Sequence, residues 1–140
     1  MGTFRRSAVL AVGFVGMIVG SARAQETLVA KIPFPFVMRG QEFPAGRYDV
    51  TNAEGVITIE GMDSRVGGVA MATPARGEDP KGREPVLVFI HSEGRYTLSQ
   101  IWESDTKGLA LMTRSGGGHH VAALSPGSEP PTVVSAGYAR

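Results

Sequence analysis

The sequence of 140 residues contains no cysteine. It therefore cannot form a disulfide framework, a thiolate metal site or a cysteine nucleophile, and it has no cysteine to carry a bacterial lipoprotein anchor. Small exported domains often depend on disulfides, so this chain must rely on a hydrophobic core. The 116 residues from Gln25 to Arg140 suffice for one modest domain.

A large excess of basic charge is also lacking. The chain has 14 basic and 13 acidic residues, a net charge of +1. Arg5, Arg6 and Arg23 belong to a predicted signal segment that contains no acid, so its removal changes the net charge of the remainder to −2. A nucleic-acid partner requires a basic face, and this sequence offers none.

Residues 1–24 have the three parts of a secretion signal. A basic start at Arg5 and Arg6 is followed by an apolar run and then by the small residues Ala22 and Ala24. We expect cleavage after Ala24 and export to the periplasm or the extracellular space, by either the general or the twin-arginine route. The apolar run of 13 residues is shorter than the roughly 20 that a membrane span needs, so we expect no stable span once the signal is removed.

A helical period is absent after the signal, and short alternating runs take its place. Runs with strand character cover residues 28–36, 47–51, 56–60, 66–73, 86–91, 95–103 and 109–114. About seven short strands separated by turns predict an all-β domain over 25–114, either an antiparallel sandwich or a small barrel. Most runs are shorter than the roughly 9–11 residues that an outer-membrane barrel strand needs.

Proline and glycine suggest how this domain is bounded. Pro33 and Pro35 remove N–H donors from one edge, so we predict that the first strand is an edge strand protected against pairing with another chain. Gly67 and Gly68 indicate a bulge or a close backbone approach. Residues 74–85 should form a solvated loop, and 115–140 a flexible Gly/Pro-rich tail with at most a brief extended piece at 131–134.

Three segments follow one another in a recognisable order: Ile32-Pro33-Phe34-Pro35-Phe36, then Pro44-Ala45-Gly46-Arg47-Tyr48-Asp49-Val50, then Leu98-Ser99-Gln100-Ile101-Trp102. Over roughly residues 28–103 the chain resembles a group of small exported β-rich proteins abundant in acidobacteria. The resemblance implies an exported β-protein with no assigned activity. The Gly-rich end of this chain departs from the charged, helix-prone end that members of that group often have.

Few residues suggest metal or catalytic chemistry. His119 and His120 are weak metal candidates, because a metal site needs three or four converging ligands; we predict no metal and no cofactor. His91 precedes Ser92 and Glu93, which are triad residue types, but the sequence has no nucleophile elbow. We expect His91 to be a strand-end histidine that makes one hydrogen bond.

Acid–base catalysis on a glycan would need a pair of carboxylates. The candidates are Asp49, Glu60, Glu103 and Asp105, and alternation or turn position places each of them on the surface. We therefore predict no catalytic pair.

Tyr96, Gln100 and Trp102 are the candidate ligand-binding residues. Alternation places all three on one face of the strand at 95–103, together with Leu98, so core packing competes with a ligand pocket as their role. A buried amide needs partners, so Gln100 either ties neighbouring backbone together or lines a polar pocket.

We therefore expect an exported, non-catalytic binding or structural module of unknown specificity, with a cell-envelope or protein partner. The alternative is a small-ligand carrier or hydrolase with a pocket near those three residues. A third reading is self-assembly through strand edges, which the two prolines oppose on one side. An enzyme should show a concave site with convergent polar groups and perturbed titrations, whereas a structural module should have a filled interior.

Overall fold

The computed structural model describes residues 25–112 and 129–139, and the regular structure in these ranges is entirely β-strand. The predicted all-β class is confirmed. In the same ranges no helix is long and apolar enough to cross a membrane. The predicted signal segment and its cleavage site after Ala24 lie outside the described residues. The strands are β1 (Thr27–Ile32), β2 (Phe36–Met38), β3 (Gln41–Phe43), β4 (Gly46–Ala53), β5 (Val56–Gly61), β6 (Gly67–Pro74), β7 (Val86–Ser92), β8 (Arg95–Trp102), β9 (Gly108–Leu111) and β10 (Thr132–Tyr138).

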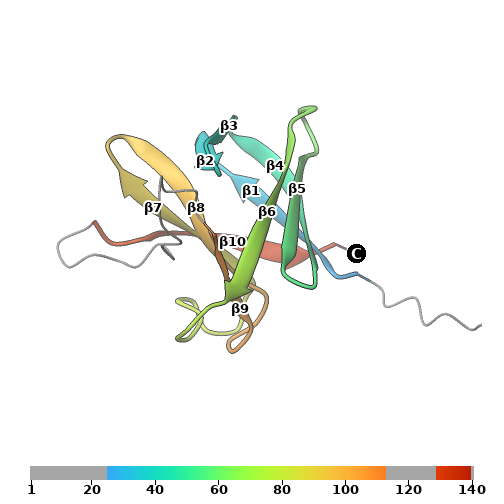
Figure 1. Cartoon of the computed structure of the whole chain (residues 1–140), viewed down its shortest axis with the longest axis vertical. Helices are drawn as coiled ribbons and strands as arrows, with labels where there is room; N and C mark the ends of the chain where they lie inside the picture. The colour runs from blue at the N-terminus through green and yellow to red at the C-terminus, as the bar shows by residue number, and fades with distance from the viewer. Residues whose placement is uncertain (1–24, 113–128, 140) are drawn as a thin grey trace, which may run out of the picture.

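Eight of these strands close into an antiparallel barrel (Figure 1). The order around the ring is β1-β4-β5-β6-β9-β8-β7-β10, and β10 pairs again with β1. Of the two predicted architectures, the chain therefore adopts the small barrel. The β2–β3 hairpin is an addition to the ring, in which β2 runs parallel to β8.

Several hairpins turn through two residues that both have positive φ. These pairs are Arg39-Gly40, Glu54-Gly55 and Glu93-Gly94, each with φ near 51° at the first residue. Such turns match the right-handed twist of the strands that they join, and glycine takes the second position without steric cost. The turns predicted around residues 52–55 and 92–94 are therefore confirmed.

The first strand is not the edge strand that its prolines predict. Leu28 of β1 pairs with Val50 of β4 on one side and with Tyr138 of β10 on the other. Pro33 follows the last residue of β1, where its missing N–H ends the ladder instead of protecting an edge. The apolar alternation continues past that point because Phe36 packs into the same core from the next segment.

Side chains from every strand of the ring and from the hairpin fill the barrel. An eight-stranded barrel has an interior that side chains alone can fill. The aromatic rings meet there, and the centroid of Phe36 lies 5.0 Å from that of Phe43 and 5.5 Å from that of Phe89. The buried set is Leu28, Ala30, Ile32, Phe36, Met38, Phe43, Tyr48, Val50, Ile57, Ile59, Ala70, Leu87, Phe89, Leu98, Ile101, Leu109 and Leu111.

A β-bulge in β8 reverses the predicted alternation. Val88 of β7 pairs with Gln100, whereas the next residue, Phe89, pairs with Leu98, which leaves Ser99 as an extra residue. One extra residue exchanges the two faces of a strand. Leu98 and Ile101 therefore both pack in the interior. The prediction that Tyr96, Leu98, Gln100 and Trp102 share one face is wrong.

A second, smaller core lies on the outer face of β7 and β8. Val86, Val88 and Trp102 are buried there, with Ala75 and Val133 packed against them. The predicted loop between β6 and β7 is attached to the same region, since the Ala75 N–H donates to the Gly108 carbonyl oxygen at 2.8 Å. Most of that loop is exposed, as expected, although Asp79 is buried.

β9 pairs with only the last part of β6, and the β2–β3 hairpin covers the first part of that strand. Arg39 and Gln41 donate side-chain hydrogen bonds to the carbonyl oxygens of Val69 and Gly67, at 3.4 and 3.1 Å. A Cβ added at Gly68 would lie 2.8 Å from Phe43 Cζ. The close approach predicted at Gly67–Gly68 is therefore confirmed.

β10 corrects the predicted domain boundary. The sequence predicts a β-domain that ends at residue 114 and a flexible tail over 115–140, with at most a brief extended piece at 131–134. Instead, 132–138 form a strand of the ring. Its small side chains give a weak pattern, but without it β7 and β1 would have unpaired edges. Residues 113–128, including His119 and His120, lie outside the described part of the chain.

The Trp102 ring makes Gly108 sensitive to substitution. A Cβ at Gly108 would lie 2.5 Å from Trp102 Cε3, and the buried indole has little room to move. We expect Gly108→Ala to lower the free energy of unfolding by about 1–3 kcal/mol. Thermal denaturation should show a melting temperature lower by roughly 4–8 °C per kcal/mol.

Gly137→Ala on β10 is the matched control, because a Cβ there meets nothing within 4 Å. Its melting temperature should stay close to that of the wild type. Equal losses in the two variants would contradict the close packing of Gly108 on the indole.

Candidate functional site

The structure separates Tyr96 from the other two predicted ligand-binding residues, Gln100 and Trp102. Tyr96 lies on the core side of β8, where Phe34 stacks on it at a centroid distance of 3.9 Å. Trp102 lies in the outer core, only 1% exposed, and its Nε1–H donates to Gln100 Oε1 at 3.0 Å. Gln100 therefore has a local partner, and the three residues line no common hollow.

Tyr96 does line a shallow groove of about 520 Å³ with Pro35 and with residues of the β2–β3 hairpin, including Phe43. The rings of Phe34 and His91 both stack on Tyr96, at 3.9 and 4.4 Å. Little of the Tyr96 ring face is left for a ligand. This groove is a poor match to the predicted pocket.

His91 lies one residue before the end of β7, as predicted. Its Nδ1 lies 2.6 Å from Glu129 Oε2, just ahead of β10. The expected strand-end histidine with one hydrogen bond is confirmed. His91 thus helps to hold the start of the last strand against the β7–β8 hairpin.

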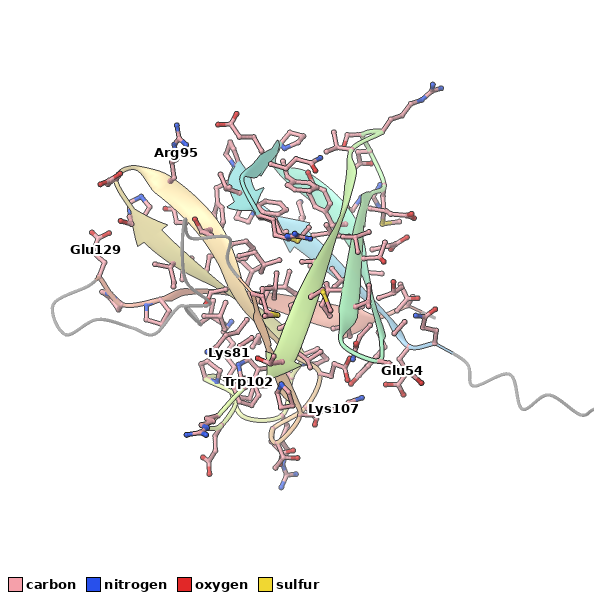
Figure 2. The ribbon with its side chains drawn as sticks, in the orientation of Figure 1. Glu54, Lys81, Arg95, Trp102, Lys107 and Glu129 are labelled. Carbon is pink, nitrogen blue, oxygen red and sulfur yellow. The ribbon has the colours of Figure 1, made fainter. Side chains whose placement is uncertain are left out.

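A polar cleft of about 740 Å³ opens at one end of the barrel. Three parts of the chain meet there: the residues ahead of β1, the β4–β5 turn and the β8–β9 turn. Figure 2 shows Glu54 and Lys107 near this end, away from Arg95 on the β7–β8 hairpin. The cleft is lined by Gln25, Glu26, Asn52, Ala53, Glu54, Glu103 and Lys107.

Glu103 anchors the cleft. It is 7% exposed, and its Oε1 accepts a hydrogen bond from Asn52 Nδ2 at 3.0 Å, while its Oε2 forms a salt bridge with Lys107. Its backbone carbonyl accepts a hydrogen bond from Tyr138 Oη at 2.5 Å. The predicted surface position of Glu103 is therefore wrong.

The cause of that burial is a tight turn after β8. The Glu103 N–H donates to the Lys107 carbonyl oxygen at 2.9 Å, so the carboxylate folds back over the end of the barrel. The spacing of Glu103 and Lys107, four residues apart, is visible in the sequence. Asn52 is 51 residues away along the chain, so only the folded structure could reveal that contact.

The cleft has more acids than bases, with Glu26, Glu54 and Glu103 against Lys107. The hydrogen bond from Lys107 to Glu103 raises the pKa of the lysine, and the charge of Glu26 raises it further. Burial raises the pKa of the neighbouring Tyr138, and Glu26 and Glu103 add to this shift. Both groups titrate above their ordinary alkaline ranges, so neither is suited to transfer protons near neutral pH.

Tyr138 gives the cleft region an aromatic ring. The side chain is 47% exposed although its hydroxyl is bonded to Glu103. Among residues 25–112 and 129–139, no three His, Asp or Glu side chains are placed to hold a metal ion. The arrangement thus offers amides, carboxylates and an aromatic surface, which suit hydrogen bonding to a polar ligand.

The fold and the cleft define a small antiparallel barrel with a filled interior and a polar hollow at one end. No protein-family model, no curated protein and no solved structure matches the chain. The resemblance to exported proteins of acidobacteria therefore stays a prediction.

The raised pKa values of Lys107 and Tyr138 predict a loss of stability at alkaline pH. The folded state holds both protons more tightly than the unfolded state, so this contribution is complete below the ordinary pKa values of 10.5 and 10.0. It is lost as the pH rises through the folded-state pKa values. Above about pH 10, the unfolding free energy of Lys107→Met should decrease less steeply with pH than that of the wild type. Urea denaturation at a series of pH values measures this difference.

The same variant should also be about 1 kcal/mol less stable at neutral pH, because Glu103 loses its cationic partner. Lys31→Met, which removes an exposed lysine of β1, is the control. If Lys31→Met flattened the profile as much, the Glu103–Lys107 pair would not be the cause.

Proposed function

We propose that the protein is an exported, non-catalytic binding module whose end cleft holds a glycan of the cell envelope. The observation that carries this proposal is the cleft itself, where amides, carboxylates and an ammonium group from distant parts of the chain converge beside an exposed Tyr138. Amides and carboxylates form directional hydrogen bonds with sugar hydroxyl groups. The tyrosine adds an apolar ring surface with a polar end.

The charge of the cleft narrows the class of ligand. Three carboxylates against one ammonium disfavour an anionic polymer such as a nucleic acid. A neutral glycan or one that carries amino groups meets no such repulsion. The negative net charge expected after removal of the signal favours the same class.

The packing of the barrel supports a non-catalytic role. Side chains occupy the interior, and the shifted groups at the cleft titrate well above neutral pH. The alternative of a carrier or hydrolase depended on a pocket near Tyr96, Gln100 and Trp102, but Tyr96 packs against the inner core, whereas Trp102, bonded to Gln100, is buried in the outer core. That alternative has lost the feature that motivated it.

Export remains part of the proposal and rests on the N-terminal signal pattern. Gln25, the first residue after the expected cleavage site, lines the cleft. Processing after Ala24 would therefore leave the new chain end at the rim of this hollow.

The proposal is tested by thermal unfolding of the chain from Gln25 to Arg140, which retains β10, against cell-wall glycans, lipids and divalent metals. A ligand at 100 times its dissociation constant adds about 2.7 kcal/mol. For a domain of this size the melting temperature should then rise by roughly 10 °C or more. We expect this shift with a neutral or amino-bearing glycan.

Glu54→Gln should reduce the glycan-induced shift. Glu93→Gln is the matched control, because Glu93 has the same φ of 51° in the equivalent position of the β7–β8 turn and does not line the cleft. A shift with lipids alone, or a glycan shift that Glu54→Gln leaves unchanged, would contradict the proposed site.

A further inference from the structure

The residue that the expected cleavage would place at the chain end is a glutamine. Cleavage after Ala24 leaves Gln25 with a free α-amino group, and Gln25 lines the end cleft. An N-terminal glutamine has an unusual reactivity, because its amine can reach the amide of its own side chain. Attack on that amide closes an unstrained ring of the same size as the pyrrolidine ring of proline.

The start of β1 fixes where this chain end lies. Thr27, the first residue of β1, pairs with Thr51 of β4, and its carbonyl oxygen accepts a hydrogen bond from the Ala139 N–H at 2.8 Å. Figure 1 shows the start of β1 (blue) beside the end of β10 (red). Gln25 lies two residues ahead of Thr27, so the register of β1 places it at the rim of the cleft.

Gln25 has the freedom that ring closure requires. It is exposed, and the pairing of β1 with β4 and β10 begins only at Thr27 and Leu28. The backbone nitrogen of Gln25 therefore takes no part in these two ladders. Ring closure fixes φ at about −65°, as in proline, and a residue outside a ladder can adopt this angle without breaking strand pairing.

The charges around Gln25 determine what ring closure changes. The charge of the adjacent Glu26 contributes to the raised pKa of Lys107, so this end of the chain lies close to the cleft's ammonium group. A free α-amino group has a pKa of about 7.7–8.0 and is mostly protonated at neutral pH. An open chain end would therefore add a second cation to a cleft whose lining residues include one base, Lys107.

We propose that Gln25 becomes a cyclic lactam, pyroglutamate, once the signal is removed, and that this neutral ring forms part of the ligand-binding cleft. The neutral α-amine attacks the side-chain carbonyl carbon Cδ, so a bond between nitrogen and Cδ forms and the bond between Cδ and Nε2 breaks. Nε2 leaves as ammonia and takes one proton from the attacking amine. This inference rests on the proposed function, since it requires export with cleavage after Ala24.

The lactam suits the class of ligand proposed for the cleft. It offers one N–H donor and one carbonyl acceptor, which form hydrogen bonds with sugar hydroxyl groups. Without a positive chain end, the carboxylates of Glu26 and Glu54 stay available to an amino-bearing glycan. An open ammonium group would compete for these carboxylates and repel the amino groups of such a ligand.

A chain that begins at Gln25 tests ring closure directly. It is made as a fusion whose partner a protease removes without leaving an extra residue, and it is incubated in neutral phosphate buffer. We expect the intact mass to decrease by the mass of one ammonia and Edman sequencing to become blocked. Gln25→Asn is the matched control, because it has the same amide and amine but would need a smaller, strained ring.

The full chain, expressed with its own signal in a Gram-negative host, shows whether the ring forms after export. The N-terminal peptide of the exported protein should begin at Gln25 in the lactam form. A shortened chain that does not lose ammonia, or an exported chain that keeps a free amine at Gln25, would overturn the inference. An exported chain that begins at another residue would overturn it too, but would leave the cleft to be tested by Glu54→Gln.

Glycan titration tests the role of the ring in the cleft. The chain with the closed ring is compared with Gln25→Asn, whose end keeps its ammonium group. An amino-bearing glycan should bind Gln25→Asn with a dissociation constant about two- to fivefold higher, the effect of one charge contact at an exposed site. A neutral glycan should bind both chains nearly equally.

Equal affinities of both chains for the amino-bearing glycan would show that the chain end does not contact the ligand, and would overturn the role of the ring in the cleft. Binding of no glycan by either chain would contradict the proposed function together with that role. The loss of ammonia would still establish the ring itself, so the two failures are distinguishable.

Discussion

Closure of the ring is the constraint on which the rest of this structure depends. Without a disulfide, the apolar core is protected only if every neighbouring strand is paired, because an open edge leaves backbone groups unsatisfied. β10 closes one gap, between β7 and β1. A second gap lies beside β6. β9 pairs with the last part of that strand, and the β2–β3 hairpin covers the rest, where Arg39 and Gln41 bond to carbonyl groups that β9 does not reach.

The bulge at Ser99 determines how the two faces of β8 are used. It turns Ile101 inward beside Leu98 and places Trp102 in the outer core. Without the extra residue, a large aromatic ring would enter an interior that other side chains already fill. The bulge therefore explains both the second core outside the barrel and the separation of Gln100 and Trp102 from Tyr96.

The end cleft is a consequence of the same closure. β10 brings Tyr138 to the turn after β8, and the β4–β5 hairpin brings Asn52 to Glu103. A buried carboxylate needs such partners, since an unpaired charge away from water is costly. The polar cleft and the closure of the ring thus both depend on β10: its first half pairs with β7, and its last residue holds the cleft turn in place.

Local patterns were enough to predict the all-β class, the hairpin turns and the loop before β7, because alternation and turn chemistry act over a few residues. They did not predict the Ser99 bulge, the internal position of β1, the burial of Glu103 or the strand at 132–138. Each of these depends on a partner far away in the chain: Val88 for the bulge, β10 for β1, Asn52 for Glu103, and β7 with β1 for the last strand. Pairing between distant strands is decided by closure of the whole ring, so only the tertiary structure could establish it.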